Sequence, residues 1–253
     1  MIIPPGLHIV GTPIGNLDDI TLRALQTLRE ASLVLAEDTR HTSILFARHE
    51  LRRPLASCHK FNEASRLDEV AARIAAGEII ALVSDSGMPG ISDPGSRVVR
   101  GCRERGLPVW VVRGPSAVVS AVSLSGWGDE GFIFAGFLPT GPGSRKNALR
   151  ALSTERRAVV VYESPHRIAR LLADIAEIMG DRPVMVAREL TKKFEESPAG
   201  TAAALLAAHG DRPWKGEIAV VIHPAPKHFA PPSAVPGADA DDATECAPEP
   251  QPD

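Results

Sequence analysis

Four segments of the sequence combine glycine or proline with polar side chains directly after a short apolar run. They are Gly11–Asn16, Ser84–Gly90, Gly114–Ala117 and Arg188–Lys193. In open α/β sheets, ligands bind outside the carboxyl ends of the strands, where loops of this kind gather. Glycine lets a ligand approach the main chain closely. The four loops therefore predict a ligand held in a cleft between strand ends.

The segment Ser84–Gly95 contains three glycines and lies between a predicted strand and a predicted helix. The preceding run Ile79–Val83 is short, apolar and rich in β-branched residues, which is typical of a buried parallel strand. Asp85 then offers a carboxylate at the tip of that strand. Asp93 favours a helix over 94–105, of which it would be the N-cap.

Several kinds of catalytic motif are absent from the sequence. Neither a Gly-x-Ser-x-Gly nucleophile motif nor a G-x-x-x-x-G-K-[ST] phosphate loop occurs. The first glycine loop reads G-x-x-x-G, and Pro13 removes a backbone donor from it, which disfavours a dinucleotide site. Glu37, Asp38 and His41 could hold a metal ion, but the neighbouring cation favours an ion-pair network, so we predict no metal. An enzyme with neither nucleophile nor metal indicates a cofactor that carries its own reactive group.

Short apolar runs alternate with amphipathic stretches along most of the chain, which predicts repeated β–α units. The predicted strands are Leu7–Val10, Leu33–Ala36, Ile79–Val83, Val109–Val112, Phe132–Leu138, Ala158–Tyr162, Val184–Ala187 and Ile218–Ile222. The predicted helices cover residues near 18–31, 64–76, 94–105, 118–124, 145–152, 165–179 and 201–208. We expect an α/β fold of two α/β/α domains with mainly parallel sheets, at residues 1–115 and 116–223.

The charged residues are unevenly distributed. The formal net charge is −3, yet residues 1–223 hold 27 basic and 25 acidic residues, whereas 224–253 hold six acidic residues and one lysine. The first region is not strongly basic, so any contact with RNA has to come from local patches. The proline-rich segment 224–253 cannot bury enough apolar surface to fold, and we expect a disordered acidic tail there.

Cysteine usage and hydropathy indicate a cytoplasmic protein. Cys58, Cys102 and Cys246 are far apart and form no C-x-x-C pair, which suits a reducing compartment. No run approaches the roughly 20 apolar residues of a membrane span. Pro4 and Pro5 interrupt the first apolar stretch, where a signal peptide would need continuity. We therefore expect a soluble protein with no membrane partner.

Eight short motifs occur along the chain in a fixed order. They are Val10-Gly11-Thr12-Pro13-Ile14-Gly15-Asn16-Leu17, Glu37-Asp38-Thr39-Arg40-His41, Ser84-Asp85-x-Gly87-x-Pro89, Asp93-Pro94-Gly95, Gly114-Pro115-Ser116-Ala117, Tyr162-Glu163-Ser164-Pro165-His166-Arg167, Arg188-Glu189-Leu190-Thr191-Lys192 and Lys215-Gly216-Glu217. Together they resemble the 16S rRNA (cytidine-2′-O)-methyltransferase I family, within the tetrapyrrole methylase (class III) superfamily. The resemblance covers residues 7–222.

This resemblance implies a tetrapyrrole methylase-like fold that binds S-adenosyl-L-methionine in the interdomain cleft, and it implies a homodimer. It also implies methyl transfer to the ribose 2′-hydroxyl of a decoding-centre cytidine in 16S rRNA of the small ribosomal subunit. By position in the motifs, the implied cofactor contacts are Pro13, Ser84, Asp85, Ser86, Gly87, Pro115, Ser116, Ala117 and Ala187. Asp85 is our hypothesis for the partner of the cofactor's positive charge.

Methyl transfer to a ribose hydroxyl needs alignment and a nearby base, because the hydroxyl is a weak nucleophile. The catalytic candidates, among which the sequence does not choose, are Glu63, Glu37, Asp38 and Glu189, with Lys192 as a stabiliser of negative charge. The candidate RNA-binding residues are Arg40, His59, Lys60, Asn62, Arg188, Lys192 and Lys193. Arg145 and Lys146 are candidates either for phosphate contacts or for a solvated helix face.

Two other functions remain open at this point. One is methylation of a small, porphyrin-like molecule, although the Glu37–His41 and Tyr162–Arg167 motifs speak against it. The other is a non-catalytic RNA- or cofactor-binding module. Met88 favours that alternative, because it stands where the family usually has a threonine hydroxyl beside the cofactor loop.

Overall fold

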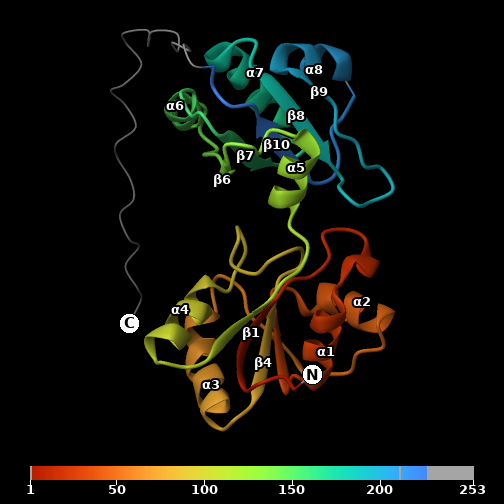
Figure 1. Ribbon diagram of the computed structural model, residues 1–253, viewed down its shortest axis with the longest axis vertical. Coiled ribbons are helices and arrows are strands. Elements are labelled where there is room, and N and C mark those ends of the chain that lie inside the picture. The colour runs from red at the N-terminus through yellow and green to blue at the C-terminus, as the bar shows by residue number, and fades with distance from the viewer. Residues whose placement is uncertain (1, 211, 227–253) are drawn as a thin grey trace, which may run out of the picture.

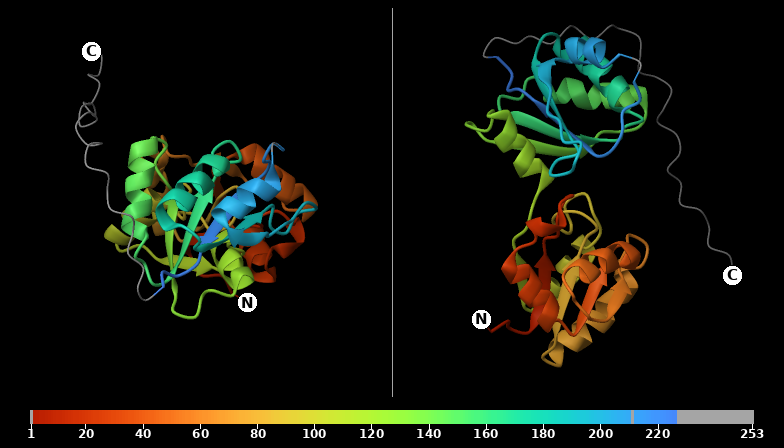
Figure 2. Two further views of the ribbon diagram at one scale, coloured as in Figure 1. Left: turned by 90° about the horizontal axis from the view of Figure 1, so that it is seen from above. Right: turned by 90° about the vertical axis from the view of Figure 1, so that its right-hand side faces the viewer.

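The chain folds into two α/β halves that are stacked end to end, as Figures 1 and 2 show. The computed structural model describes residues 2–210 and 212–226. The main chain passes between the halves at 113–116, after the last strand of the first sheet and before helix α5. Of the predicted acidic tail, 227–253 lies outside the described residues.

The first half contains a five-stranded parallel sheet. Its strands are β1 (Gly6–Val10), β2 (Leu33–Ala36), β3 (Leu55–Ser57), β4 (Ile79–Val83) and β5 (Val109–Val112), in the spatial order β3-β2-β4-β1-β5. Its helices are α1 (Leu22–Glu30), α2 (Thr39–Arg48), α3 (Glu63–Ala75) and α4 (Ser96–Glu104). Because every pairing is parallel, the carboxyl ends of all five strands lie along one edge of the sheet.

Helices cover both faces of this sheet, because its strands are apolar on both sides. One face packs Val34, Ala36 and Ala81 against α1 and α2, with Leu28 fully buried. On the other face, Leu7, Leu33, Leu35, Ile80 and Leu82 pack against α3 and α4, through side chains that include Val70, Ile74, Val98 and Cys102. The helix α2 was not predicted. The strand β3 was also missed, because it is only three residues long.

The second half contains a mixed sheet. Its strands are β6 (Phe132–Phe137), β7 (Ala158–Glu163), β8 (Pro183–Arg188), β9 (Ala199–Thr201) and β10 (Ile218–Ile222), in the order β6-β7-β10-β8-β9. Its helices are α5 (Ala117–Ser125), α6 (Pro142–Leu152), α7 (Ile168–Met179) and α8 (Ala202–His209). Only β6 and β7 pair in parallel, whereas β10 runs antiparallel to both β7 and β8. The α/β fold class is confirmed, but the prediction of mainly parallel sheets is wrong for this half.

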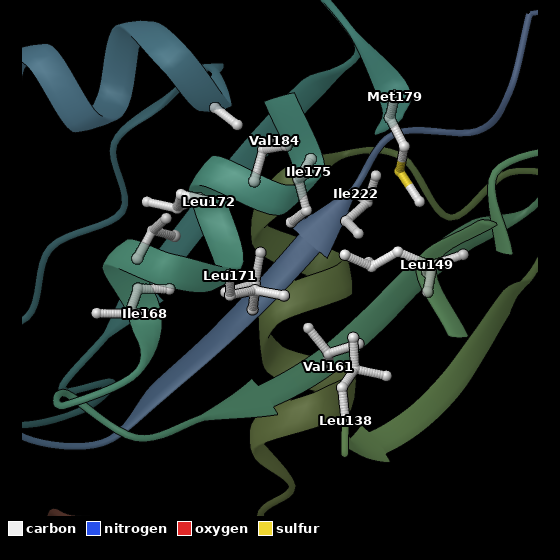
Figure 3. Close-up of a cluster of buried hydrophobic side chains, with 14 of the residues drawn as sticks. Leu138, Leu149, Val161, Ile168, Leu171, Leu172, Ile175, Met179, Val184 and Ile222 are labelled. Carbon is white, nitrogen blue, oxygen red and sulfur yellow. The ribbon is translucent and has the colours of Figure 1, made fainter. Parts of the chain in front are cut away.

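Alternating strand residues build two cores on the mixed sheet. Val159 and Val161 point to the face covered by α6, α7 and α8, where Leu171, Leu172 and Ile175 fill the centre of the cluster in Figure 3. The opposite face packs against α5, through Val118, Ala121 and Val122. Ile14, from the first glycine loop of the first half, is part of that second core. The two halves therefore share buried apolar surface as well as the chain crossing.

Some candidate features are absent from the part of the chain that the structure describes. Within 2–210 and 212–226, no helix has both the length and the apolar content to cross a membrane. In the same ranges, no three or more His, Cys, Asp or Glu residues are grouped so that they could hold a metal ion. Cys58 and Cys102 are buried free thiols.

Candidate active site between the two halves

The strand ends of the two halves face each other and enclose a cavity of about 350 Å³. The first half lines it with Ile14 and with residues 86–88 and 91–93, which follow β4. The second half lines it with the start of α5, the ends of β7 and β8 and the start of β10. This volume is within the range of pockets that bind cofactors. We call it the first cavity.

Two glycine loops of the first half are tied together at the edge of this cavity. The backbone N–H of Thr12 donates to the carbonyl of Gly87 at 2.9 Å, and the N–H of Gly87 donates back at 3.2 Å. The Thr12 hydroxyl also donates to the carbonyl of Ser84 at 3.1 Å. A Cβ on Gly11 would lie 2.6 Å from Cα of Gly114, so only glycine lets the first loop touch the chain crossing at 113–116. The loops therefore form one rigid surface for a ligand.

Asp93 lies half-buried in the lining of the first cavity. The predicted role of Asp93 as a helix N-cap is wrong. Gly95, in the left-handed conformation, occupies the N-cap position, and α4 begins at Ser96. Burial, together with the negative charges of Glu37 and Asp85, raises the pKa of Asp93 to about 7. Burial and the charge of Asp85 also raise the pKa of Glu37. The carboxylates at this end of the first cavity thus repel one another, and a cationic ligand would relieve this repulsion.

Aromatic side chains from the second half form part of the wall of the first cavity. Tyr162 and Phe137 line it, and their ring centroids are 5.6 Å apart. Burial and the charge of Asp93 raise the pKa of Tyr162 to about 12, so its hydroxyl stays protonated at neutral pH. Tyr162 belongs to one of the eight sequence motifs but was not predicted as a site residue. Its position at the end of a predicted strand was the available signal.

A second cavity, of about 360 Å³, adjoins the first on the side of α2. Pro13, Ser84, Asp85, His41 and Lys192 are among the residues that line it. Three residues line both cavities, and they are Ile14, Ser86 and Glu217. The two spaces therefore meet at these side chains, and a molecule in one can approach a molecule in the other.

Glu189, Lys192 and Glu217 form a bonded group at the junction of the cavities. Lys192 Nζ lies 2.9 Å from Glu189 Oε1 and 3.0 Å from Glu217 Oε2. The backbone N–H of Glu217 also donates to Glu189 Oε1 at 3.0 Å. Burial opposes the charge of Lys192, but its hydrogen bonds to the two carboxylates raise its pKa above the usual value. Lys192 is therefore a fixed positive charge, not a base, at neutral pH.

The predicted cofactor residues divide between the two cavities. Ser86, Gly87, Ser116, Ala117 and Ala187 line the first. The second is lined by Pro13, Ser84, Asp85 and again Ser86. Pro115 lines neither cavity, but its carbonyl oxygen would lie 3.6 Å from a Cβ built on Gly87, so it stands behind the lining. Their assignment as cofactor contacts stays a prediction.

Two of the carboxylate candidates for catalysis hold the main chain of the first half. Glu63 is buried and accepts hydrogen bonds from the N–H groups of Gly95 and Arg97. Asp38 caps α2 and forms an ion pair with Arg40 at 2.6 Å, and these hydrogen bonds lower its pKa far below the usual range. Neither Glu63 nor Asp38 lines either cavity.

Most of the candidate RNA-binding residues lie outside the cavity linings. Arg188 forms an ion pair with Glu196 at 2.6 Å. Asn62 accepts a hydrogen bond from the N–H of His59 at 2.7 Å, within the turn that carries the exposed Lys60. Lys193 is exposed next to Lys192, with its Nζ 5.5 Å from the centre of the Phe194 ring. Lys192 alone of the seven candidates lines a cavity.

Comparison with known proteins identifies the family. Residues 6–206 match the family described as Tetrapyrrole (Corrin/Porphyrin) Methylases. A Ribosomal RNA small subunit methyltransferase I from Thermotoga maritima is 47% identical over 216 residues, which cover 85% of this chain and 97% of the relative. The chain belongs to the ribosomal RNA small subunit methyltransferase I family. The protein of the same name from Escherichia coli O157:H7 is 42% identical, over 85% of this chain and 77% of the relative. The family resemblance is confirmed, and this member of the family is a methyltransferase.

Solved structures confirm the tetrapyrrole methylase fold of this family member. A uroporphyrin-III-C-methyltransferase from Thermus thermophilus has a TM-score of 0.61 and 20% identity, and the match covers 86% of this chain and 93% of that chain. A diphthine synthase has a TM-score of 0.63 and 15% identity, over 86% and 89%. Since the names of these two enzymes denote different substrates, the fold by itself does not select a substrate.

Proposed function

We propose that the protein transfers a methyl group from S-adenosyl-L-methionine to the ribose 2′-hydroxyl of a decoding-centre cytidine in 16S rRNA of the small ribosomal subunit. The observation that carries this proposal is the junction of the two cavities at Ile14, Ser86 and Glu217. One cavity has the size of a cofactor pocket, and the second opens beside it as a space for the acceptor. The relatives named as rRNA methyltransferases support the choice of substrate.

The lining of the first cavity fits a cofactor with net positive charge. Among the described residues that line it there are three carboxylates, Asp93, Glu163 and Glu217, and no lysine or arginine. Its apolar floor includes Ile14, Leu190 and Ile218. S-adenosylmethionine has a sulfonium, an ammonium and an adenine, so carboxylates and an apolar floor both suit it. When bound, it supplies an activated methyl group for in-line displacement.

The residues of the chain would contribute alignment, exclusion of water and charge. The paired loops at Thr12 and Gly87 would fix the donor, and the apolar core around Ile14 would keep water from its reactive carbon. Lys192, held positive between two carboxylates, would stabilise the negative charge that develops on the attacking oxygen. None of these contributions requires a protein nucleophile or a metal ion.

We also propose the domain boundary near 115, a homodimer and a cytoplasmic location. The boundary is supported by the two sheets, whose strands end at Val112 and begin again at Phe132.

The homodimer is supported by β5, an edge strand on which the apolar side chains Trp110 and Val111 are exposed. Light scattering of the wild type and of Val111→Lys tests it. We expect a dimer for the former and a monomer for the latter, and a monomeric wild type would contradict the proposal.

The proposed reaction is tested by mapping ribose methylation in 16S rRNA from a strain that lacks the gene. We expect one cytidine in the decoding centre to lose its 2′-O-methyl group, and purified protein with S-adenosylmethionine to restore it on isolated small subunits. Calorimetry of the purified protein with S-adenosylmethionine tests the cofactor separately. An unchanged methylation map, or no binding of the cofactor even with subunits present, would overturn the proposal.

A further inference from the structure

We propose that Glu217, which the sequence left out of the catalytic candidates, is the base that takes the proton from the attacking hydroxyl. This inference rests on the proposed function, because it concerns the acceptor of that same methyl transfer. It assigns to the Lys215-Gly216-Glu217 motif a chemical role beyond its place in the fold.

The position of Glu217 is the first observation that supports its role as the base. It is the one carboxylate among the described residues that lines both cavities, so it lies where donor and acceptor would meet. Its side chain is 68% exposed, which leaves the carboxylate accessible to a large RNA substrate and to water that would carry the proton away. The antiparallel direction of β10 places it there, because the first residue of that strand, not its last, lies at the cleft.

The second observation is that hydrogen bonds to Glu189 and Lys192 hold Glu217 in place. Its N–H donates to the carboxylate of Glu189, and its carbonyl accepts the N–H of Glu189 at 2.9 Å. Lys192 then fixes the carboxylate of Glu217 at 3.0 Å. Glu189 and Thr191 have φ angles of 53° and 66°, which are unfavourable for residues other than glycine. Strain of this kind is often found where a structure holds functional groups in place.

The alternative carboxylates are less suited to the role. Glu189 is engaged by Lys192 and by the backbone of Glu217, and it lines neither cavity. Glu37 also lines neither cavity. Asp85 lines only the second cavity, where it accepts the N–H of Asp38 at 3.1 Å. Asp93 lines only the first, on the side of the cofactor.

The step balances in atoms and charge. The ribose oxygen forms a bond to the methyl carbon while the carbon–sulfur bond breaks, and that electron pair stays on sulfur as a neutral thioether. The hydroxyl proton moves to Glu217, which becomes a neutral carboxylic acid and then releases the proton to solvent. Lys192 keeps its three protons throughout and acts as a positioning and charge-stabilising group. General-base catalysis of this kind contributes about 10²–10⁴ in rate.

The test compares Glu217→Gln with the wild type on small subunits. Gln keeps the size of the side chain but not its basicity, so we expect turnover to fall by at least about 100-fold. The dissociation constants for S-adenosylmethionine and for the subunit, measured by calorimetry and filter binding, should stay within threefold. The reason is that solvent screens the charge of the 68% exposed Glu217, while Asp93 and Glu163 remain in the first cavity. Glu130→Gln is the matched control, because Glu130 is an exposed glutamate that lines neither cavity, and it should keep wild-type turnover.

The pH–rate profile provides a second measurement. Lys192 and Glu189 contact Glu217 directly. The other charged or titratable groups that line the same cavities are Asp93, Tyr162, Glu163, Asp85 and His41. General-base catalysis gives the pH–rate profile of the wild type an acid limb, and Glu217→Gln should lose this limb. Glu217→Asp keeps a carboxylate and should recover at least tenfold over Glu217→Gln.

Each adverse outcome has a distinct meaning. Turnover within threefold of wild type in Glu217→Gln overturns the assignment, as does an acid limb that persists in that variant. A large loss of cofactor affinity in Glu217→Gln also overturns it, because Glu217 would then be a binding residue. If the wild type binds S-adenosylmethionine but methylates no rRNA, the proposed function itself fails, whatever the variants do.

Discussion

The backbone N–H of Asn16, in the first half, donates a hydrogen bond to the hydroxyl of Thr191, in the second half, at 3.0 Å. Beside it, a Cβ on Gly15 would lie 2.6 Å from Cγ of Lys192. The first glycine loop and the loop after β8 are therefore in direct contact across the molecule. This contact helps to set the distance between the first glycine loop and the bonded group of Glu189, Lys192 and Glu217.

We expect Thr191→Val to weaken this contact, because valine keeps the shape of threonine but cannot accept the hydrogen bond. The loss should be about 0.5–1 kcal/mol in unfolding free energy, as for a single partly exposed hydrogen bond. Hydrogen exchange at the amide of Asn16 should become faster, while Thr191→Ser should keep the wild-type rate. Equal exchange rates in wild type and Thr191→Val would show that the bond is not maintained in solution.

Gly216→Ala should disturb the carboxylate group at the cavity junction. Gly216 has φ near 80°, and a Cβ there would lie 2.3 Å from the carboxylate of Glu189. Gly77 is a matched control, since it has φ near 86° and open space around its Cβ position. Each alanine should cost about 1 kcal/mol for its backbone conformation, and the close contact should add to this at Gly216 alone.

Activity separates the two alanine variants further. Gly216→Ala should reduce turnover at least tenfold, because it displaces Glu189 and with it Lys192, whereas Gly77→Ala should keep wild-type turnover. Thermal unfolding and a methylation assay on small subunits measure the two effects. Equal turnover in both variants would argue against a role for the Glu189–Lys192–Glu217 group.

Binding of the cofactor should depend on pH through Asp93. Its pKa is raised to about 7, by burial and by the charges of Glu37 and Asp85, and a cationic ligand favours the ionised form. The affinity for S-adenosylmethionine should therefore increase roughly tenfold from pH 6 to pH 8, with uptake of the ligand releasing a proton. Calorimetry in buffers of different ionisation enthalpy measures the affinity and the number of protons released. Asp93→Asn should abolish this pH dependence. A separate variant, Asp85→Asn, tests the hypothesis that Asp85 pairs with the positive charge of the cofactor.

The same carboxyl affects the stability of the free protein. Because its folded-state pKa is above the ordinary value of 3.8, the fold favours the protonated form. That stabilisation is fully present below about pH 4 and is lost as the pH rises through about 7. Asp93→Asn should thus raise the thermal midpoint at pH 8 and leave it nearly unchanged at pH 4. A shift of equal size at both pH values would point to a change in packing rather than in charge.

Arg145 should matter for stability and not for RNA binding. Its Nε lies 2.6 Å from Oδ2 of Asp174, and both side chains are at most 10% exposed. The expectation that Arg145 faces RNA or solvent is thus wrong. We expect Arg145→Met to cost about 3 kcal/mol, because it leaves Asp174 buried with only Lys146 nearby, at 3.8 Å. Replacing Asp174 by Leu in the same chain should recover most of the loss, and affinity for small subunits should stay unchanged in both variants.

Most of the strands and helices could be predicted from the sequence because they depend on local pattern, whereas β3, β9 and α2 were not predicted. The apolar run at Ile79–Val83 and the glycines after it determine a strand and a loop from neighbouring residues alone. The motifs at Gly11–Asn16 and Ser84–Gly87 indicated the cavity-lining loops for the same reason. The family, too, was recognisable in the sequence, since its motifs are short and their order is fixed.

The direction of β10 was decided only by the tertiary structure, because a short apolar strand has the same composition in either direction. That direction brings Glu217 to the cavities, and it could not be inferred from residues 215–222. The role of Asp93 and the burial of Arg145 depended likewise on partners distant in sequence, Glu37 and Asp174. The protonation state of a titratable side chain depends on neighbours that only folding brings close to it. The chemistry of this cleft therefore follows from its three-dimensional packing.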